Sequence, residues 1–347
     1  MAYTTIDKPT DYFNTVLYTG NAGTLNVTGV GFSPSLVWIK GRGYADSQVL
    51  TDTVRGTTKC LSSDSTTAEF TQTNGLTAFG GDGFTLGNWS AINRASTTVA
   101  WNWKAGTSFT NDASSTGIGS IDSAGSVNTD AGFSIITFTG TGSAGTVAHG
   151  LGAIPKFLVV KSRSNANGWI VYHGSLGAGK GISLNLTDAA FSTGSRWNST
   201  EPTSTVFSLG TAADVNRSSG THVCYAFAEK QGYSKFGSYT GNGSTDGVFC
   251  FTGFKPAFVL CKNTGNSGAQ WLMVDNKRVG INPIENYVQA NSSSAEATGT
   301  DNYDFLSNGF KCRSTNSWNN QSGYNIIYMA FAENPFVTST GVPATAR

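Results

Sequence analysis

Apolar and polar side chains alternate over short stretches along the whole chain. Residues 101–103 (Trp-Asn-Trp) and 225–228 (Tyr-Ala-Phe-Ala) place an aromatic ring at every second position. This period of two, with many β-branched and aromatic residues, predicts half-buried strands. Glycine-containing stretches such as 19–23 (TGNAG) and 139–145 (TGTGSAG) predict tight turns between the strands. No segment keeps a helical period over three turns, so the pattern predicts an all-β protein whose sheets cover one another.

The same order of landmarks occurs three times along the chain. Each copy has an aromatic-Thr-Gly triplet, a proline before an apolar strand that ends in lysine, an apolar stretch followed by Asp or His, and two later aromatic strands. The Asp or His follows the proline by 18, 18 and 19 residues; the pairs are Pro34 with Asp52, Pro155 with His173, and Pro256 with Asp275. Landmarks in register across three copies predict three tandem β-sandwich or jelly-roll-like repeat units of ~100 residues.

The landmarks and the composition between them divide the chain into segments. Residues 106–129 are rich in Gly, Ser, Thr and Ala and poor in large apolar residues, which predicts a linker. The predicted segments are an N-terminal arm at 1–9, repeat 1 at 10–105, the linker at 106–129, repeat 2 at 130–229, repeat 3 at 230–336 and a C-terminal tail at 337–347.

Composition excludes several classes of function. Charged residues make up 12% of the chain and the net charge is +1, so the basic surface of a nucleic-acid-binding protein is not expected. No apolar run has the length of a membrane span, and the first residues lack the pattern of a secretory signal. The five cysteines are widely spaced, which argues against a disulfide framework and predicts small buried side chains in a protein that folds in a reducing cytoplasm.

The sequence has no pattern of catalytic, metal-binding or cofactor-binding residues. The three histidines lack the spacing of zinc ligands, no GxSxG motif occurs, and the acids are sparse and lie mostly in turns, which disfavours a glycosidase. We therefore predict a non-enzymatic protein without cofactor or metal, although oxygen-rich turns leave calcium binding by a loop open. His173 stands where the other copies have Asp52 and Asp275, and a residue that hydrogen-bonds a turn fits this exchange better than a catalytic group.

Three tryptophans and one asparagine are candidate surface contacts. Trp89, Trp197 and Trp318 lie in polar stretches beside Asn and Ser residues, among them Asn319. Aromatic rings next to amide groups are typical of surfaces that stack on a sugar or on a neighbouring subunit. A ring that anchors its own loop has the same sequence pattern. Trp103, in contrast, lies in an alternating strand and is expected in the core.

Four long stretches of the sequence resemble a known protein family. They are residues 1–20, 100–127, 230–260 and 304–347. Over essentially its whole length the chain is similar to a family of tailed-phage proteins, common in marine and aquatic phages, that carry a poorly characterised repeat domain and are usually described as structural or tail-associated.

The resemblance implies a virion component that folds in the host cytoplasm. The leading expectation is a non-enzymatic tail fibre or tail-associated appendage that contacts other virion proteins and a host surface glycan. A head decoration or cement protein is one alternative, and a polysaccharide-binding or -degrading tailspike is another. Phage appendages are closed homo-oligomers, so a trimer is expected, without nucleic acid and without membrane insertion.

Overall fold

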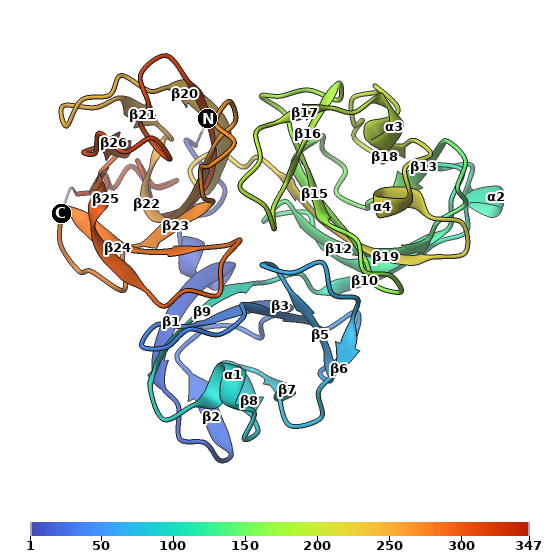
Figure 1. The fold of residues 1–347 in the computed structure, drawn as a ribbon, viewed down its shortest axis with the longest axis horizontal. Helices are drawn as coiled ribbons and strands as arrows, with labels where there is room; N and C mark the ends of the chain where they lie inside the picture. Colours follow the sequence, from blue (N-terminus) through green and yellow to red (C-terminus); the bar gives the residue numbers. More distant parts are fainter. Residues whose placement is uncertain (1, 346–347) are drawn as a thin grey trace.

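The computed structural model describes residues 2–345 and is almost entirely β-structure (Figure 1). Strands hold 45% of the residues and helices 6%, which confirms the predicted all-β sandwich architecture. Each α-helix in the described part of the chain has only four residues. Within residues 2–345, no helix is long and apolar enough to cross a membrane. Met1 of the predicted arm and Ala346 and Arg347 of the predicted tail lie outside the described residues.

Unit 1 (residues 9–105) consists of two antiparallel layers. The main sheet has the order β1-β9-β3-β4-β5-β6, and a second sheet has the order β2-β8-β7. The elements are η1 (Pro9–Asp11), β1 (Phe13–Thr19), β2 (Leu25–Thr28), β3 (Leu36–Gly41), β4 (Val49–Asp52), β5 (Lys59–Ser62), β6 (Phe70–Thr71), β7 (Leu76–Gly80), β8 (Gly83–Leu86), α1 (Ser90–Asn93) and β9 (Thr97–Trp103).

Unit 2 (residues 106–229) has a similar layout, with two more strands in the main sheet and one strand fewer in the second layer. Its main sheet has the order β10-β11-β12-β19-β14-β15-β16-β17, and β13 pairs with β18 in the second layer. The elements are β10 (Thr107–Asn111), α2 (Ala113–Thr116), β11 (Ser123–Asn128), β12 (Phe133–Thr139), β13 (Gly145–Ala148), β14 (Pro155–Ser162), β15 (Trp169–His173), β16 (Lys180–Ser183), β17 (Phe191–Ser192), α3 (Gly194–Trp197), β18 (Val206–Leu209), α4 (Ala213–Asn216) and β19 (Thr221–Ala228).

Unit 3 (residues 230–335) has the same strand order, but its two layers are joined into one curved sheet. That sheet has the order β20-β27-β22-β23-β24-β25-β26-β21. The elements are β20 (Ser234–Thr240), β21 (Phe249–Phe251), β22 (Phe254–Asn263), β23 (Leu272–Asp275), β24 (Ile284–Gln289), β25 (Ala297–Leu306), β26 (Gly309–Cys312) and β27 (Asn325–Pro335).

The segment predicted to be a linker belongs instead to the fold of unit 2, so the prediction of a linker is wrong. Strand β11 pairs with β12 in antiparallel register, with Val127 opposite Ser134, and β10 pairs in turn with β11. A chain poor in large side chains forms strands here because the edge of β12 offers unpaired backbone groups. Residues 106–129 are therefore an insertion that units 1 and 3 lack in the described structure.

Alternation along each main sheet sends apolar side chains to both of its faces. In β3, Val37 and Ile39 face the second layer of their own unit, whereas Leu36 and Trp38 face the centre of the molecule. The other two units follow the same rule. Each unit thus has its own outer core, and all three share one central core.

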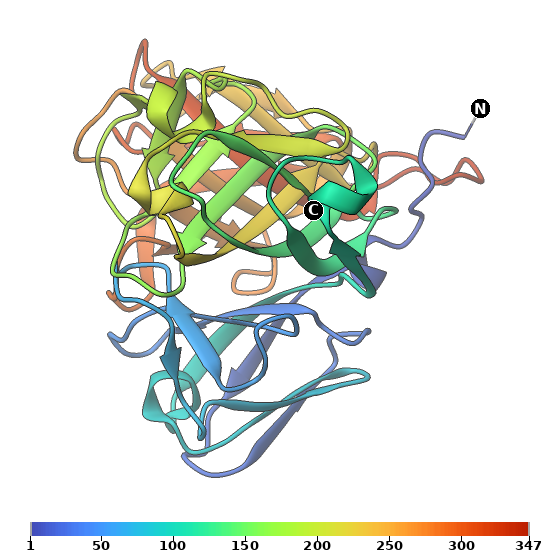
Figure 2. The ribbon, with the colours of Figure 1, turned by 90° about the vertical axis from the view of Figure 1, so that its right-hand side faces the viewer.

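The three units surround the central core with approximate threefold symmetry (Figure 1), and the view from the side shows unit 1 packed below the other two (Figure 2). Trp103 lies at the junction. Its ring centroid is 6.3 Å from that of Phe227 in unit 2, and 6.1 and 5.8 Å from those of Phe258 and Phe331 in unit 3. The rings that meet at the centre therefore come from all three units.

Replacing Trp103 tests the shared core. Trp103 is 2% exposed, and we expect Trp103→Ala to lower the free energy of unfolding by about 3–5 kcal/mol because it opens a cavity between three units. The indole N–H has no hydrogen-bond partner among the described residues, so Trp103→Phe should cost less. Denaturant titration measures both, with Leu17→Ala, at a site 40% exposed, as the control. Equal losses for Trp103→Ala and Leu17→Ala would contradict this placement.

Candidate functional site

The sequence landmarks lie at the three boundaries between units, which we call seams. At each seam the Asp or His that ends β4, β15 or β23 faces the closing strand of the next unit. The seams are 1–2, 2–3 and 3–1, so they form a closed ring around the central core (Figure 1).

A buried ionic network crosses the 1–2 seam. Arg55 donates from Nε to Asp52 Oδ2 at 2.5 Å, and the hydroxyl of Tyr225 in unit 2 donates to the same oxygen at 2.8 Å. Arg55 also contacts Glu69 at 3.2 Å, and Glu69 accepts two hydrogen bonds from Arg163 of unit 2 at 2.8 and 2.9 Å. Burial opposes ionisation of Glu69, but the two arginines outweigh it and lower the pKa of this carboxyl.

The 3–1 seam has the same network with one exchange. Arg278 donates to Asp275 at 2.7 Å and contacts Glu296 at 3.2 Å, and Arg42 of unit 1 holds Glu296 through two bonds of 2.8 and 2.9 Å. The Tyr hydroxyl is replaced by the indole N–H of Trp101, which donates to Asp275 Oδ2 at 3.1 Å.

The 2–3 seam has none of these ionic contacts, because a different residue stands at each of the five positions of the network. His173 takes the aspartate position, and its Nδ1 accepts the backbone N–H of Ser175 at 3.0 Å. Its Nε2 therefore carries the proton and donates to the backbone oxygen of Tyr328 at 3.1 Å. The residues at the remaining positions of the network are Leu176, Ala190, Thr264 and Met329. A carboxylate here would have no arginine and no side-chain donor, which explains why a neutral imidazole replaces it.

Two further sets of contacts repeat at all three seams. Trp169 donates its indole N–H to Ser62 O and Trp271 donates to Ser183 O, each at 2.9 Å, and Gln48 donates to Gln289 O at the third seam. The strand-end lysines also reach backbone oxygens of the neighbouring unit. These bonds join Lys40 to Ser293, Lys161 to Thr66 and Lys262 to Thr187. Burial lowers the pKa of each of these three lysines to about 8.

The four predicted surface contacts do not form an exposed site. Trp197 is 1% exposed and packs edge-on against Tyr172 in the outer core of unit 2. Trp89 and Trp318 are half-buried against the outer cores of units 1 and 3. Asn319 is fully buried. Each tryptophan therefore anchors its own unit, in line with the second reading of the sequence pattern.

A repeated asparagine was not recognised in the sequence. Asn93, Asn216 and Asn320 are fully buried, and each side-chain oxygen accepts a backbone N–H from the turn that follows β1, β12 or β20. Gly20 of the aromatic-Thr-Gly landmark lies so close to this segment that a Cβ would be 2.0 Å from the backbone oxygen of Arg94. The signal was present as Asn followed by Arg or Gln and then by small residues, in all three copies.

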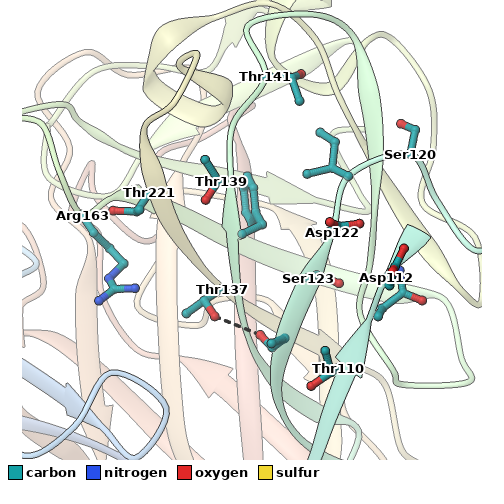
Figure 3. A pocket seen from close by; sticks show the side chains of 14 residues that line it. Thr110, Asp112, Ser120, Asp122, Ser123, Thr137, Thr139, Thr141, Arg163 and Thr221 are labelled. Atoms are coloured by element: carbon teal, nitrogen blue, oxygen red, sulfur yellow. Dashed lines mark hydrogen bonds between the residues drawn. The ribbon is translucent and has the colours of Figure 1, made fainter. Parts of the chain in front are cut away.

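The insertion of unit 2 borders an open pocket of about 570 Å³, drawn in Figure 3. Hydroxyl groups dominate the wall, and two carboxylates and one guanidinium contribute charge. The polar lining residues labelled in the figure are Thr110, Asp112, Ser120, Asp122, Ser123, Thr137, Thr139, Thr141, Arg163 and Thr221.

Several of these polar groups also hold the insertion in place. Asp112 accepts the backbone N–H groups of Ser114 and Ser115 at the start of α2, and hydrogen bonds from Ser114 and Ser115 lower the pKa of its carboxyl. Asp122 accepts the backbone N–H of Ala113 at 2.8 Å. Thr139 and Thr221 are exposed and lie opposite each other on β12 and β19. The pocket can therefore offer hydroxyl and carboxylate oxygens to a neutral polar ligand.

Removing one member of the 1–2 network tests its energetic role. We expect Asp52→Ala to lower the free energy of unfolding by about 3–5 kcal/mol, because Arg55 would remain buried without its main partner. The matched variant carries the five residues of the 2–3 seam: Asp52→His, Arg55→Leu, Glu69→Ala, Arg163→Thr and Tyr225→Met. It should lie within about 1–2 kcal/mol of the wild type in urea titrations. A fivefold variant less stable than Asp52→Ala would contradict the equivalence of the seams.

The His173 imidazole should make the molecule sensitive to acid. Burial lowers the pKa of His173 from 6.5 to about 4, so between these values the unfolded chain binds a proton that the folded chain does not. The contribution of His173 to the free energy of unfolding is fully present above pH 6.5. It falls by about 2–3 kcal/mol as the pH drops towards 4. The difference in unfolding free energy between wild type and His173→Gln, followed across this range, isolates the effect. Parallel pH profiles of the two proteins would contradict it.

No curated protein matches the chain. A model of a domain family of unknown function, DUF7483, matches residues 8–335 and so includes all three units. The chain belongs to this family.

Proposed function

We propose that the protein is a non-enzymatic structural component of a phage virion, and that it serves as a tail fibre or tail-associated appendage. The observation that carries the proposal is the closed arrangement of three units around one core within a single chain. Tail appendages commonly have threefold symmetry, and this chain has the shape of a trimer without needing three copies. The resemblance to tailed-phage structural proteins supports the same role.

The seams support a role that requires persistence outside a cell. Every seam closes with buried hydrogen bonds, and two of the three add a buried arginine that contacts two carboxylates. All five cysteines are buried thiols that form no disulfide, so the fold is independent of disulfide formation. The charged clusters at the seams bond to the neighbouring units, which favours a structural rather than a catalytic use of these residues.

In this role, the pocket beside the insertion is the part we assign to contact with a host surface glycan. It belongs to the only unit with an insertion in the described structure, and its hydroxyl and carboxylate oxygens suit the hydroxyl groups of a sugar. Unit-specific insertions in an otherwise repeated fold commonly carry the variable function.

A head decoration protein is the second candidate. The observation that favours it is the same pseudo-threefold body, which has the symmetry of a local threefold position in a capsid lattice. The two roles differ in the number of copies that a particle needs.

The number of chains in each purified virion distinguishes these roles. Quantitative mass spectrometry against a labelled standard should find between a few and a few dozen copies for a tail appendage, whereas hundreds would indicate head decoration. Antibody labelling in the electron microscope gives the position independently. Purified protein incubated with host polysaccharide should release no new reducing ends. Absence of the chain from washed virions would overturn the proposal.

A further inference from the structure

The strand that begins the second layer of each unit has an edge that is covered differently in the three units. These strands are β2, β13 and β21, and each has one small apolar residue that points into its own outer core. In the equivalent positions stand Val27, Val147 and Cys250, all at most 6% exposed. Strand β21 is the last strand of its sheet, and β2 is likewise at an edge.

Unit 2 covers this edge with its own chain. Ser120 and Ile121 of the insertion donate their backbone N–H groups to Thr146 O at 2.9 and 3.0 Å, and Ile121 forms a parallel bridge with Val147. The edge therefore accepts backbone pairing in this fold. Unit 1 has polar side chains, Asn26 and Thr28, at the outward positions.

Unit 3 has two phenylalanines at these same positions. Phe249 is 43% exposed and Phe251 is 56% exposed, and both point away from the outer core on the same face of β21. Residues 247–253 contain no charged residue and no proline, which are the usual means of blocking a sheet edge. Unit 3 thus has the edge without the insertion of unit 2 and without the polar residues of unit 1.

The backbone of β21 has hydrogen-bonding groups on its open side. Thr252 N donates to Asn308 O at 3.0 Å and Cys312 N donates to Val248 O at 3.0 Å, so the even-numbered residues bond to β26. In an antiparallel pair the backbone N–H and C=O groups of the alternate residues point away from the partner strand. The N–H and C=O groups of Phe249 and Phe251 therefore face the open edge.

We propose that β21 pairs with β21 of a second copy of this chain, antiparallel and about a twofold axis at Cys250. This register places Phe249 opposite Phe251 of the other copy, and the four outward backbone groups of each strand form four hydrogen bonds between the copies. Four phenylalanine rings then lie together on one face, where cross-strand aromatic pairs stabilise the sheet.

A second copy fits this edge better than an unrelated partner because the strand is complementary to itself. The register that satisfies every outward group of Phe249 and Phe251 is symmetric, and it brings no like charges together. The contact is smaller than a standard interface, so the dimer forms at high local concentration. The inference rests on β21 alone and does not depend on a role in a virion.

Sedimentation velocity from about 10 µM to 1 mM tests the contact. The mean mass of the wild type should rise towards that of a dimer. The variant Phe249→Asn/Phe251→Thr introduces the residues that β2 has at the equivalent positions. It should stay monomeric with an unchanged melting temperature. The control Ile154→Asn/Leu186→Asn removes two other apolar side chains that are 49% and 42% exposed, and it should associate like the wild type. A wild type that stays monomeric, or a β2-like variant that still dimerises, would overturn the proposal.

Cross-linking tests the register. A mixture of Phe249→Cys and Phe251→Cys proteins, oxidised with copper phenanthroline, should form the mixed disulfide in preference to either symmetric one, because the two positions face each other. A statistical mixture of the three products, or no cross-linking at all, would contradict the register.

Discussion

The structure depends on a burial requirement that no single unit can meet. Each main sheet has apolar side chains on both faces, and the second layer of its own unit covers only one of them. The inner face, which includes Leu36, Trp38, Trp101 and Trp103 in unit 1, would be exposed to water in an isolated unit. Burying such side chains is worth about 1.5–3 kcal/mol each, so the three inner faces must meet, and the ring of units follows from that meeting.

The polar groups at the seams determine which unit packs beside which. An apolar centre alone would tolerate units in several orders, whereas the polar groups at the seams are matched in pairs. Asp52 meets a Tyr hydroxyl, Asp275 meets an indole N–H, and His173 meets a backbone oxygen. Where the arginines are absent the aspartate is absent too, as expected because an unpartnered buried charge costs several kcal/mol. The exchange of Asp for His between repeats is therefore a consequence of the neighbouring closing strand.

The repeated sequence landmarks predicted the elements of the fold but not their assembly. Alternation in β9 and β19 indicated strands, and Trp103 was correctly expected in the core. The same alternation could not reveal that both faces of these strands are buried. Alternation shows only which of two adjacent residues is the more polar, and not whether the more polar one is exposed to water. The insertion was mistaken for a linker, since Gly and Ser form a strand here only when an existing edge supplies the partner. Trp197 was a candidate for either a surface contact or a loop anchor because its neighbours in sequence are polar, and its packing against Tyr172 in space supports the anchor.

The departures from threefold symmetry are the informative part of the molecule. The packing of three nearly equivalent units would need only the same residues in each unit. Unit 2 nevertheless has an insertion with a polar pocket, and unit 3 has two exposed phenylalanines on an edge strand. Neither feature is required by the central core. For this reason our two proposals for contacts with other molecules rest on these two features.

The central claim is that three sandwiches form one cooperative body rather than three domains on a string. Differential scanning calorimetry of the full chain tests it directly, because the ratio of the calorimetric to the van't Hoff enthalpy counts the cooperative units. The shared core predicts a single transition with a ratio close to one. Separate transitions, or a ratio near three, would show that the units unfold independently and would contradict the account.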